Sequence, residues 1–360
     1  MRVVVIPGDG IGPDVVRAAQ SVLEATGLPF EWDVQEIGSK ALSATGSSLP
    51  EAALQAIRET TLALKGPIAT AAGSSGERST NVALRRALDL SVQVRPCRSH
   101  AGVPSPFRDV NLVVIRNTAE DLYSGVEFAA GAPDTDAIIE AMRSTGRDVA
   151  PGSALSIKPV SEGACRRLIT FALDYARRNG YKRLTVVHKA TAMRSTDGLF
   201  LEVAREAMSG QNDVVCDDRQ IDAMCAELVR RPEAFGVLVT LNLYGDILSD
   251  LAAALTGGVG MAPGANYGGP LAVFEAAHGT APRHADQHRA NPMAMILCGA
   301  LLLRHVGAVD AAERVEVAVD SVLGSGRTMP ADVRDAASAS PAPSTETVAR
   351  AVASAVSSGG

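Results

Sequence analysis

Residues 2–25 read RVVVIPGDGIGPDVVRAAQSVLEA and hold the pattern that decides the fold. A β-branched run, Arg2–Ile6, leads through closely spaced glycines into an amphipathic segment from Pro13 to Ala25. β-branched residues favour strands, and proline suits the first turn of a helix because that turn needs no amide donor. The segment therefore predicts a strand, a tight turn and a helix.

The glycines of this turn, Gly8, Gly10 and Gly12, allow two interpretations. A glycine-rich turn between a strand and a helix is typical of the phosphate loop of a Rossmann domain. The spacing differs from G-x-G-x-x-G, so the turn could equally be a tight structural connection. The turn alone leaves both interpretations open.

Strand and helix signals alternate along the rest of the chain. The further predicted elements are strands at Asn111–Ile115, Leu184–Val187 and Val237–Leu241 and a helix at Thr196–Met208. Such alternation is typical of an α/β fold, and 360 residues exceed the usual size of one domain. We expect two lobes, a surface loop at Ala336–Pro343 and a last helix capped by Ser344 or Thr345.

Composition excludes several classes of protein. The 34 basic and 40 acidic residues give a net charge of −6 and form no polybasic stretch, so nucleic acid is not an expected partner. No apolar run fits a signal peptide or a membrane span, and we expect a cytoplasmic protein with no membrane partner. Five cysteines without C-x-x-C spacing indicate reduced thiols, to which we assign no role.

The most specific chemical motif is NLYGDILSD at residues 242–250. Asp246 and Asp250 are four residues apart, so on a helix both carboxylates face one side and can share a divalent cation. Carboxylate oxygens favour Mg²⁺ or Mn²⁺, and Asp222 is a natural third ligand. An isolated pair with this spacing is also typical of a solvated helix face.

Upstream residues indicate a site for a small polyanion. Ser79, Asn81 and Arg85 share one face of a predicted helix, and Arg95 and Arg116 follow on predicted strands. Arginine binds a carboxylate or phosphonate through two hydrogen bonds, whereas isolated arginines often form only weak surface ion pairs. The clustering favours a binding site.

The loop from His278 to Pro292 contains glycine and proline and carries polar side chains that could hold a nucleotide. His284 and His288 could instead indicate a zinc site. No cysteine or carboxylate with suitable local spacing completes a tetrahedral set, so the nucleotide interpretation is favoured.

At these residues the chain resembles the isocitrate and isopropylmalate dehydrogenase family of β-decarboxylating dehydrogenases, from its opening IPGDGIGP to its final helix. It is most similar to isocitrate dehydrogenases, through S-x-N-x-x-x-R at residues 79–85 and through DLYSGVEF, NLYGDILSD and HGTAP. The resemblance implies an isopropylmalate dehydrogenase-like α/β fold and not a Rossmann fold. Residues 1–90 and 257–360 would form a large domain, and residues 91–256 a smaller dimerisation domain with a clasp at about 122–161.

The resemblance also implies a set of substrate contacts. Ser79 and Asn81 would contact the γ-carboxylate of the substrate, and Arg85, Arg95 and Arg116 would bind its α- and β-carboxylates.

Proton transfer and metal binding would be shared between two subunits. Tyr123 and Lys189 are the candidates for proton transfer, since the reaction needs a base at the hydroxyl group and an acid at the enolate carbon. The family's metal ligands fall on Asp246 and Asp250 of one subunit and on Asp222 of its neighbour, which also supplies Lys189. Activity would then require a homodimer.

The coenzyme, NADP or NAD, would lie on loops. The residues implied are Lys65, Thr70, Glu275, His278, Gly279, Thr280, Ala281, Arg283, His284 and Asn291. Arg283 and His284 occupy the pair that often separates the two coenzymes. A cationic side chain there suits the 2′-phosphate of NADP.

Three segments depart from the family pattern. Residues 115–123 read IRNTAEDLY where isocitrate enzymes read IRENTEDLY, and Thr191 replaces the asparagine of VHKANIM. AAGSSGERS at residues 71–79 alters TPxGxGxRS and adds a residue. These changes indicate altered specificity more readily than lost activity.

The leading hypothesis is conversion of isocitrate to 2-oxoglutarate and CO₂ with reduction of NAD(P). The same chemistry could act on homoisocitrate, tartrate, isopropylmalate or a phosphonomethylmalate of phosphonate-antibiotic biosynthesis; isopropylmalate would need an apolar pocket and fits least well. A non-catalytic regulatory subunit is a hypothesis of another class, and the retained Tyr123 and Lys189 argue against it. An ordinary Rossmann hydroxy-acid dehydrogenase would need no metal.

Overall fold

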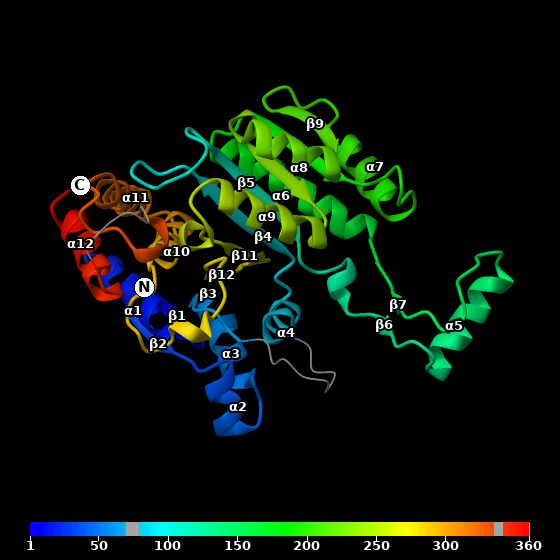
Figure 1. The fold of residues 1–360 in the computed structure, drawn as a ribbon, viewed down its shortest axis with the longest axis horizontal. Coiled ribbons are helices and arrows are strands. Elements are labelled where there is room, and N and C mark those ends of the chain that lie inside the picture. The colour runs from blue at the N-terminus through cyan, green and yellow to red at the C-terminus, as the bar shows by residue number, and fades with distance from the viewer. Residues whose placement is uncertain (70–78, 335–340, 360) are drawn as a thin grey trace.

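The computed structural model describes residues 1–69, 79–334 and 341–359. Its main feature is a ten-stranded mixed sheet in the order β2-β1-β3-β12-β11-β4-β5-β10-β8-β9 (Figure 1). The strands are β1 (Arg2–Ile6), β2 (Glu31–Val34), β3 (Leu62–Lys65), β4 (Val92–Arg98), β5 (Asn111–Asn117), β8 (Arg183–His188), β9 (Val215–Gln220), β10 (Val237–Thr240), β11 (Ala265–Gly268) and β12 (Leu271–Glu275).

Twelve α-helices cover or flank this sheet in the described part of the chain. They are α1 (Gly12–Glu24), α2 (Ser39–Thr45), α3 (Glu51–Thr60), α4 (Thr80–Ala87), α5 (Pro133–Ser144), α6 (Glu162–Arg178), α7 (Thr196–Met208), α8 (Ile221–Arg230), α9 (Asn242–Leu255), α10 (Met293–His305), α11 (Val309–Gly324) and α12 (Thr345–Ser357). The predicted strands and helices fall on observed elements with ends within two residues. The side chain of Ser344 caps α12 by accepting a hydrogen bond from the amide of Thr347 at 3.1 Å.

The glycine turn after β1 is a structural connection. Gly10 has φ +61°, and a Cβ there would lie 2.1 Å from the carbonyl oxygen of Thr280. The amide of Ile11 donates to that same oxygen at 3.0 Å. Since β4 also pairs antiparallel with both β5 and β11, the sheet is not the parallel sheet of a Rossmann domain, and that interpretation of the turn is wrong.

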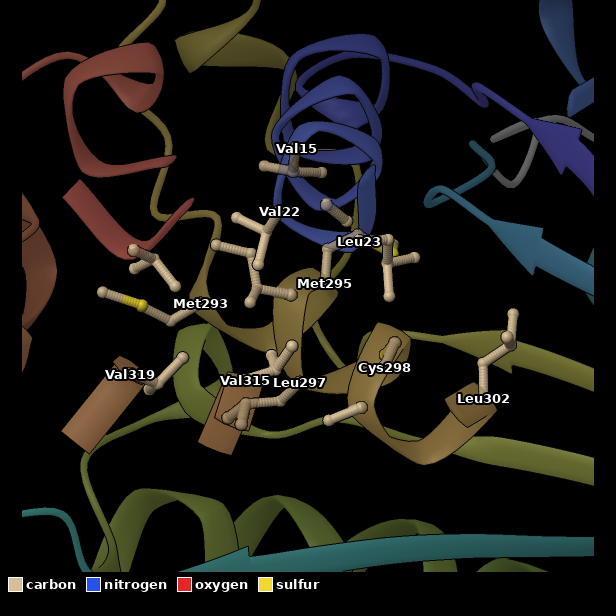
Figure 2. Close-up of a cluster of buried hydrophobic side chains, with 14 of the residues drawn as sticks. Val15, Val22, Leu23, Met293, Met295, Leu297, Cys298, Leu302, Val315 and Val319 are labelled. Atoms are coloured by element: carbon tan, nitrogen blue, oxygen red, sulfur yellow. The ribbon is translucent and has the colours of Figure 1, made fainter. Parts of the chain in front are cut away.

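The two faces of the sheet carry different side chains. Val92 and Val94 of β4 pack in an apolar cluster with α6 and α7, and the same side of the sheet carries α1, α10, α11 and α12. Figure 2 shows part of this core between α1, α10 and α11. Because side chains alternate along a strand, Gln93 and Arg95 point to the opposite face, where α9 lies.

The strand order separates two parts of the chain. β1, β2, β3, β11 and β12 come from residues 1–90 and 257–360, and the other five strands of the large sheet come from residues 91–256. We therefore propose these ranges as the two domains. No helix in the described ranges is long and apolar enough to cross a membrane.

An arm projects from the second of these parts (Figure 1). It contains β6 (Glu127–Phe128), α5 and β7 (Leu155–Ser156), and β6 pairs antiparallel with β7. The amide of Asp121 donates to the carbonyl of Pro159 at 3.0 Å, and Glu120 accepts from the amide of Ser161 at 2.8 Å. The outgoing and returning chains are thus joined at the base of the arm.

Candidate active site

Two arginines on the sheet meet the two aspartates of α9. Arg116 Nη1 lies 2.7 Å from Asp246 Oδ1, and Arg95 Nη1 lies 3.0 Å from Asp250 Oδ1. Gly245 permits this approach, because a Cβ there would lie 2.3 Å from the Cβ of Arg116. The glycine of the NLYGDILSD motif therefore brings a buried arginine against the helix that carries both acids.

Tyr123 joins this cluster from a turn at the base of the arm. Its hydroxyl donates to Asp246 Oδ2, and the guanidinium of Arg116 lies 5.9 Å from the centre of its ring. Burial and the bond to the Asp246 carboxylate raise the pKa of Tyr123 to about 12. The phenol is consequently protonated near neutral pH and can act as a proton donor.

The Asp246 carboxylate is kept ionised by its neighbours. Burial alone would raise its pKa, but the charge of Arg116, the hydrogen bond from Tyr123 and the charge of Arg95 together lower it below the ordinary value. The Asp246 side chain is 34% exposed and that of Asp250 is 59% exposed. Their oxygens are thus accessible to solvent as well as to the arginines.

Arg85 is held by a buried network around Glu275. Its Nη2 lies 2.7 Å from Glu275 Oε1, and Lys65 Nζ lies 2.7 Å from Glu275 Oε2. Gln93 and Asn266 also donate to Glu275 Oε1, at 3.2 and 2.9 Å. Lys65 and Glu275, both predicted to contact the coenzyme, therefore form a buried ion pair with each other.

Replacing Glu275 by glutamine is expected to lower the free energy of unfolding by about 3–5 kcal/mol at pH 7, because Lys65 and Arg85 lose a buried anion. Burial alone would raise the pKa of Glu275, but Lys65 and Arg85 hold it well below the ordinary value. A depressed folded-state pKa gives stability that is present above about pH 4.3 and is lost as the pH falls through the folded-state pKa. Urea unfolding of both proteins across pH 7 to 3 tests this; a difference independent of pH would contradict it.

Lys189 and Asp222 form a separate pair. Lys189 follows β8, Asp222 lies in the first turn of α8, and Lys189 Nζ is 2.6 Å from Asp222 Oδ1. Over the described ranges, no three His, Cys, Asp or Glu side chains gather as a metal site, so Asp222 does not join Asp246 and Asp250 within one chain. Each chain thus carries two separate groups of the predicted residues.

The residues predicted to bind the γ-carboxylate lie at the start of α4. Ser79 is its N-cap residue, and Asn81 Nδ2 donates to the carbonyl of Ile68 at 3.5 Å. Asn81 Oδ1 is buried without a hydrogen-bond partner, so this oxygen can still accept a hydrogen bond. Thr70, predicted to contact the coenzyme, lies outside the described residues.

The predicted coenzyme loop follows β12 and reaches α10. Gly279, Arg283 and His284 are exposed, and His278 and Ala281 are partly exposed. Asn291 is buried, and its Nδ2 donates to Asp332 Oδ2 at 3.2 Å. The predicted coenzyme residues that remain exposed are therefore those around Arg283.

His288 has a local partner that does not support a zinc site. Its Nδ1 lies 2.9 Å from Asp14 Oδ2 of α1. The described residues contain no three-ligand cluster that includes His284 and His288. This pairing ties the loop to the first helix.

The altered segment at 117–119 forms a turn beside Tyr123. Asn117 is buried, and its Oδ1 accepts from the amides of Ala119 and Glu120 at 2.7 and 3.3 Å. Thr118 donates to the carbonyl of Leu90 at 2.6 Å. A cavity of about 120 Å³ opens here, lined by Val82, Arg85, Arg86, Asp89, Leu90, Thr118, Ala119 and Tyr123.

Several residues that complete the site were missed from the sequence. Gln93 and Asn266 support Arg85 and Arg116, and Ser249 accepts a hydrogen bond from Arg95 at 2.7 Å. The alternation of Gln93 with Arg95 along one strand was the available signal for Gln93. Thr191, the other altered position, donates to Gln220 Oε1 at 2.7 Å beside Lys189.

Comparisons with known proteins agree with this geometry. Residues 2–352 match the isocitrate/isopropylmalate dehydrogenase family. The chain is 39% identical over 332 residues to a probable mitochondrial NAD isocitrate dehydrogenase subunit alpha of Caenorhabditis elegans, covering 92% of this chain and 87% of that protein. It is 38% identical over 334 residues to the human mitochondrial NAD isocitrate dehydrogenase subunit alpha, covering 92% and 85%.

A solved structure shares the whole architecture. The crystal structure of isocitrate dehydrogenase from Methylococcus capsulatus superposes with a TM-score of 0.89 at 44% identity, covering 99% of both chains. The chain therefore belongs to the isocitrate/isopropylmalate dehydrogenase family, whose members are NAD(P)-dependent β-decarboxylating dehydrogenases.

Proposed function

We propose that this enzyme converts isocitrate to 2-oxoglutarate and CO₂ with reduction of NADP or NAD. The observation that carries the proposal is the convergence of Arg95, Arg116 and Tyr123 on the two acids of α9. Cationic groups around accessible carboxylates suit a polyanionic substrate bound together with a cation. The names of the relatives described above support isocitrate as that substrate.

The chemistry of the donor set fits a divalent metal ion. Asp246 and Asp250 offer hard carboxylate oxygens from one helix face, which suits Mg²⁺ or Mn²⁺. When bound, such an ion polarises the hydroxyl and carbonyl oxygens of the substrate and stabilises the negative charge left when CO₂ departs. Asp222 of a second copy would complete the ligand set.

We further propose a homodimer in which two chains build each active site. One chain contributes Tyr123, Asp246 and Asp250, and the other contributes its Lys189–Asp222 pair. The separation of these groups within one chain supports this arrangement. The projecting arm would be the dimer clasp (Figure 1).

The side chains then have distinct tasks. Arg85, Arg95 and Arg116 bind the carboxylates adjacent to the reacting carbon, and Ser79 and Asn81 hold the γ-carboxylate. The partner's Lys189 would accept the proton of the substrate hydroxyl group, and the bound coenzyme would supply the acceptor for the hydride of the carbon that carries this hydroxyl. After CO₂ leaves, Tyr123 donates a proton to the carbon that lost it.

A spectrophotometric assay of NADP and NAD reduction with Mg²⁺ or Mn²⁺ tests the proposal. The panel contains isocitrate, homoisocitrate, isopropylmalate, tartrate and phosphonomethylmalate, and CO₂ release is measured in parallel. The proposal requires the highest kcat/KM on isocitrate. A higher kcat/KM on another substrate of the panel would identify that compound as the substrate of the same reaction. If no substrate of the panel is turned over, a non-catalytic regulatory subunit is favoured.

The cavity beside Tyr123 favours phosphonomethylmalate as a second candidate. Arg85 and Arg86 line it, and Ala119 leaves space where isocitrate enzymes carry threonine. A phosphonate is bulkier and more highly charged than a carboxylate. Its oxygens would use the Ser79 and Asn81 donors proposed for the γ-carboxylate, and the neighbouring cavity would accommodate its larger volume.

Replacing Ala119 by threonine is accordingly expected to raise the kcat/KM ratio of isocitrate to phosphonomethylmalate by about tenfold, because the added side chain fills part of the cavity. Steady-state kinetics on both substrates measures the ratio. Ala52, exposed on α3, provides a matched alanine-to-threonine control. An unchanged kcat/KM ratio in the Ala119 variant would show that this cavity does not determine substrate specificity.

The coenzyme loop leads to a second expected result. Arg283 is exposed and forms no ion pair among the described residues, so its charge is available to a 2′-phosphate. We expect Arg283→Asp to shift the kcat/KM ratio of NADP to NAD toward NAD by about 10–100-fold, since one charge-assisted contact is lost and a repulsion is added. Arg108→Asp, on an exposed loop, is the control; equal ratios in both variants would place coenzyme selection elsewhere.

A further inference from the structure

Lys158 is a nearly buried cation that has no role in the chemistry described above. It lies where the arm returns to the body of the protein, after β7 and before α6. Its Nζ is 2.5 Å from Asp197 Oδ1 and 3.8 Å from Asp121 Oδ1. The three side chains are 12%, 0% and 1% exposed, so these charges are removed from water together.

Asp197 connects this cation to the turn that carries Lys189. Its Oδ2 accepts a hydrogen bond from the backbone amide of Lys189 at 2.7 Å, while its Oδ1 faces Lys158. The amide of Asp197 donates to the carbonyl of Met193, and the amide of Met193 donates to the carbonyl of Lys189. This closed set of bonds fixes the backbone at the point where Lys189 leaves β8.

Asp121 connects the same cation to the Tyr123 side of the site. Its Oδ1 accepts from the amide of Leu122 and its Oδ2 accepts from the amide of Leu243, both at 2.8 Å. Leu243 lies in the first turn of α9, the helix that carries Asp246. The Lys158 ammonium also lies 4.8 Å from the centre of the Tyr244 ring in that turn.

We propose that Asp197 is a positioning residue for Lys189 and that Lys158 holds Asp197 in place, anchored against Asp121 at the base of the arm. The Asp197 side chain is 0% exposed and bonds the backbone amide of Lys189, so it sets the position from which the Lys189 side chain extends. The Asp197 carboxylate serves both partners through different oxygens: Oδ1 pairs with Lys158, and Oδ2 accepts from the Lys189 amide. The inference rests on the proposed role of Lys189 in proton transfer.

Two double variants separate positioning from general stability. Lys158→Met/Asp197→Asn and Lys158→Met/Asp197→Ala both remove the ion pair, but only the asparagine retains an oxygen that can accept from the Lys189 amide. We expect the alanine double variant to lose about 100-fold in kcat, since small displacements of a catalytic group have effects of that size. The asparagine double variant should retain at least about tenfold more kcat, and KM for the hydroxy acid should change little in either.

The control breaks an exposed ion pair between α6 and α7. Arg166 on α6 lies 2.9 Å from Glu206 on α7, so Arg166→Gln removes a contact between α6 and α7 that includes neither Lys158, Asp197 nor Lys189. Its kcat should equal that of the wild type. Equal kcat values for the two double variants, per folded molecule by circular dichroism, would overturn the proposal.

Hydrogen exchange gives a readout that does not require turnover. The Lys189 amide should remain protected in the asparagine double variant and lose protection in the alanine double variant; equal protection in both would overturn the positioning role. Wild-type activity on the hydroxy-acid panel separately tests the proposed function. An inactive wild type with the expected exchange pattern would refute the catalytic assignment while the Asp197 contact stands.

Discussion

Replacing Lys189 by methionine is expected to lower kcat by about 10²–10⁴-fold, because the substrate hydroxyl loses the base that accepts its proton. Tyr123→Phe should produce a loss of similar order through failure to protonate the carbon that has lost CO₂. Lys182→Met, at an exposed position just before β8, is the matched control and should retain wild-type kcat. Steady-state kinetics at saturating coenzyme measures all three.

Mixing the two inactive proteins tests whether the site is shared. Half of the randomly reassembled dimers are heterodimers, and one of the two sites in each heterodimer combines an intact Tyr123 with an intact Lys189. Denaturation and refolding of an equal mixture should therefore restore about a quarter of the wild-type activity. If both residues served a site within one chain, no site in the mixture would be complete and no activity would return.

Removal of divalent metal is expected to abolish turnover, with recovery on addition of Mn²⁺ or Mg²⁺. Asp250→Asn should lower kcat/KM by at least about 10²-fold at limiting metal, since a bound cation contributes several kcal/mol to charge stabilisation. Activity after EDTA dialysis, titrated with Mn²⁺, measures both effects.

An exposed aspartate provides the control for this experiment. Asp310 lies in the first turn of α11, away from α9, and Asp310→Asn should titrate with Mn²⁺ as the wild type does. Full activity of the wild type in EDTA would exclude a metal-dependent decarboxylation. Such a result would favour the reaction of an ordinary hydroxy-acid dehydrogenase, which transfers a hydride without a metal ion.

The local parts of the site could be predicted from the sequence. Asp246 and Asp250 lie on one helix face because a spacing of four residues determines this wherever the helix packs. The strand-turn-helix at residues 2–25 was equally readable, since its periodicity and its proline are contained in the segment itself.

Other contacts required the folded chain. Arg85 and Glu275 are 190 residues apart, and their ion pair follows from the strands that place β12 beside β3 and β11. No local pattern marks Lys158 or Asp197, 39 residues apart, as partners. Their meeting depends on how the base of the arm packs against α7.

By itself, the sequence determined the α/β class, the aspartate pair of α9, the arginines and the family resemblance. Only the tertiary structure decided that the glycine turn packs on Thr280, that Glu275 pairs with Arg85 and that Lys158 pairs with Asp197. The physical reason is the range of the interactions. Helix and strand periodicity acts over a few residues, whereas the partner of a buried charge is selected by the packing of elements distant in the chain.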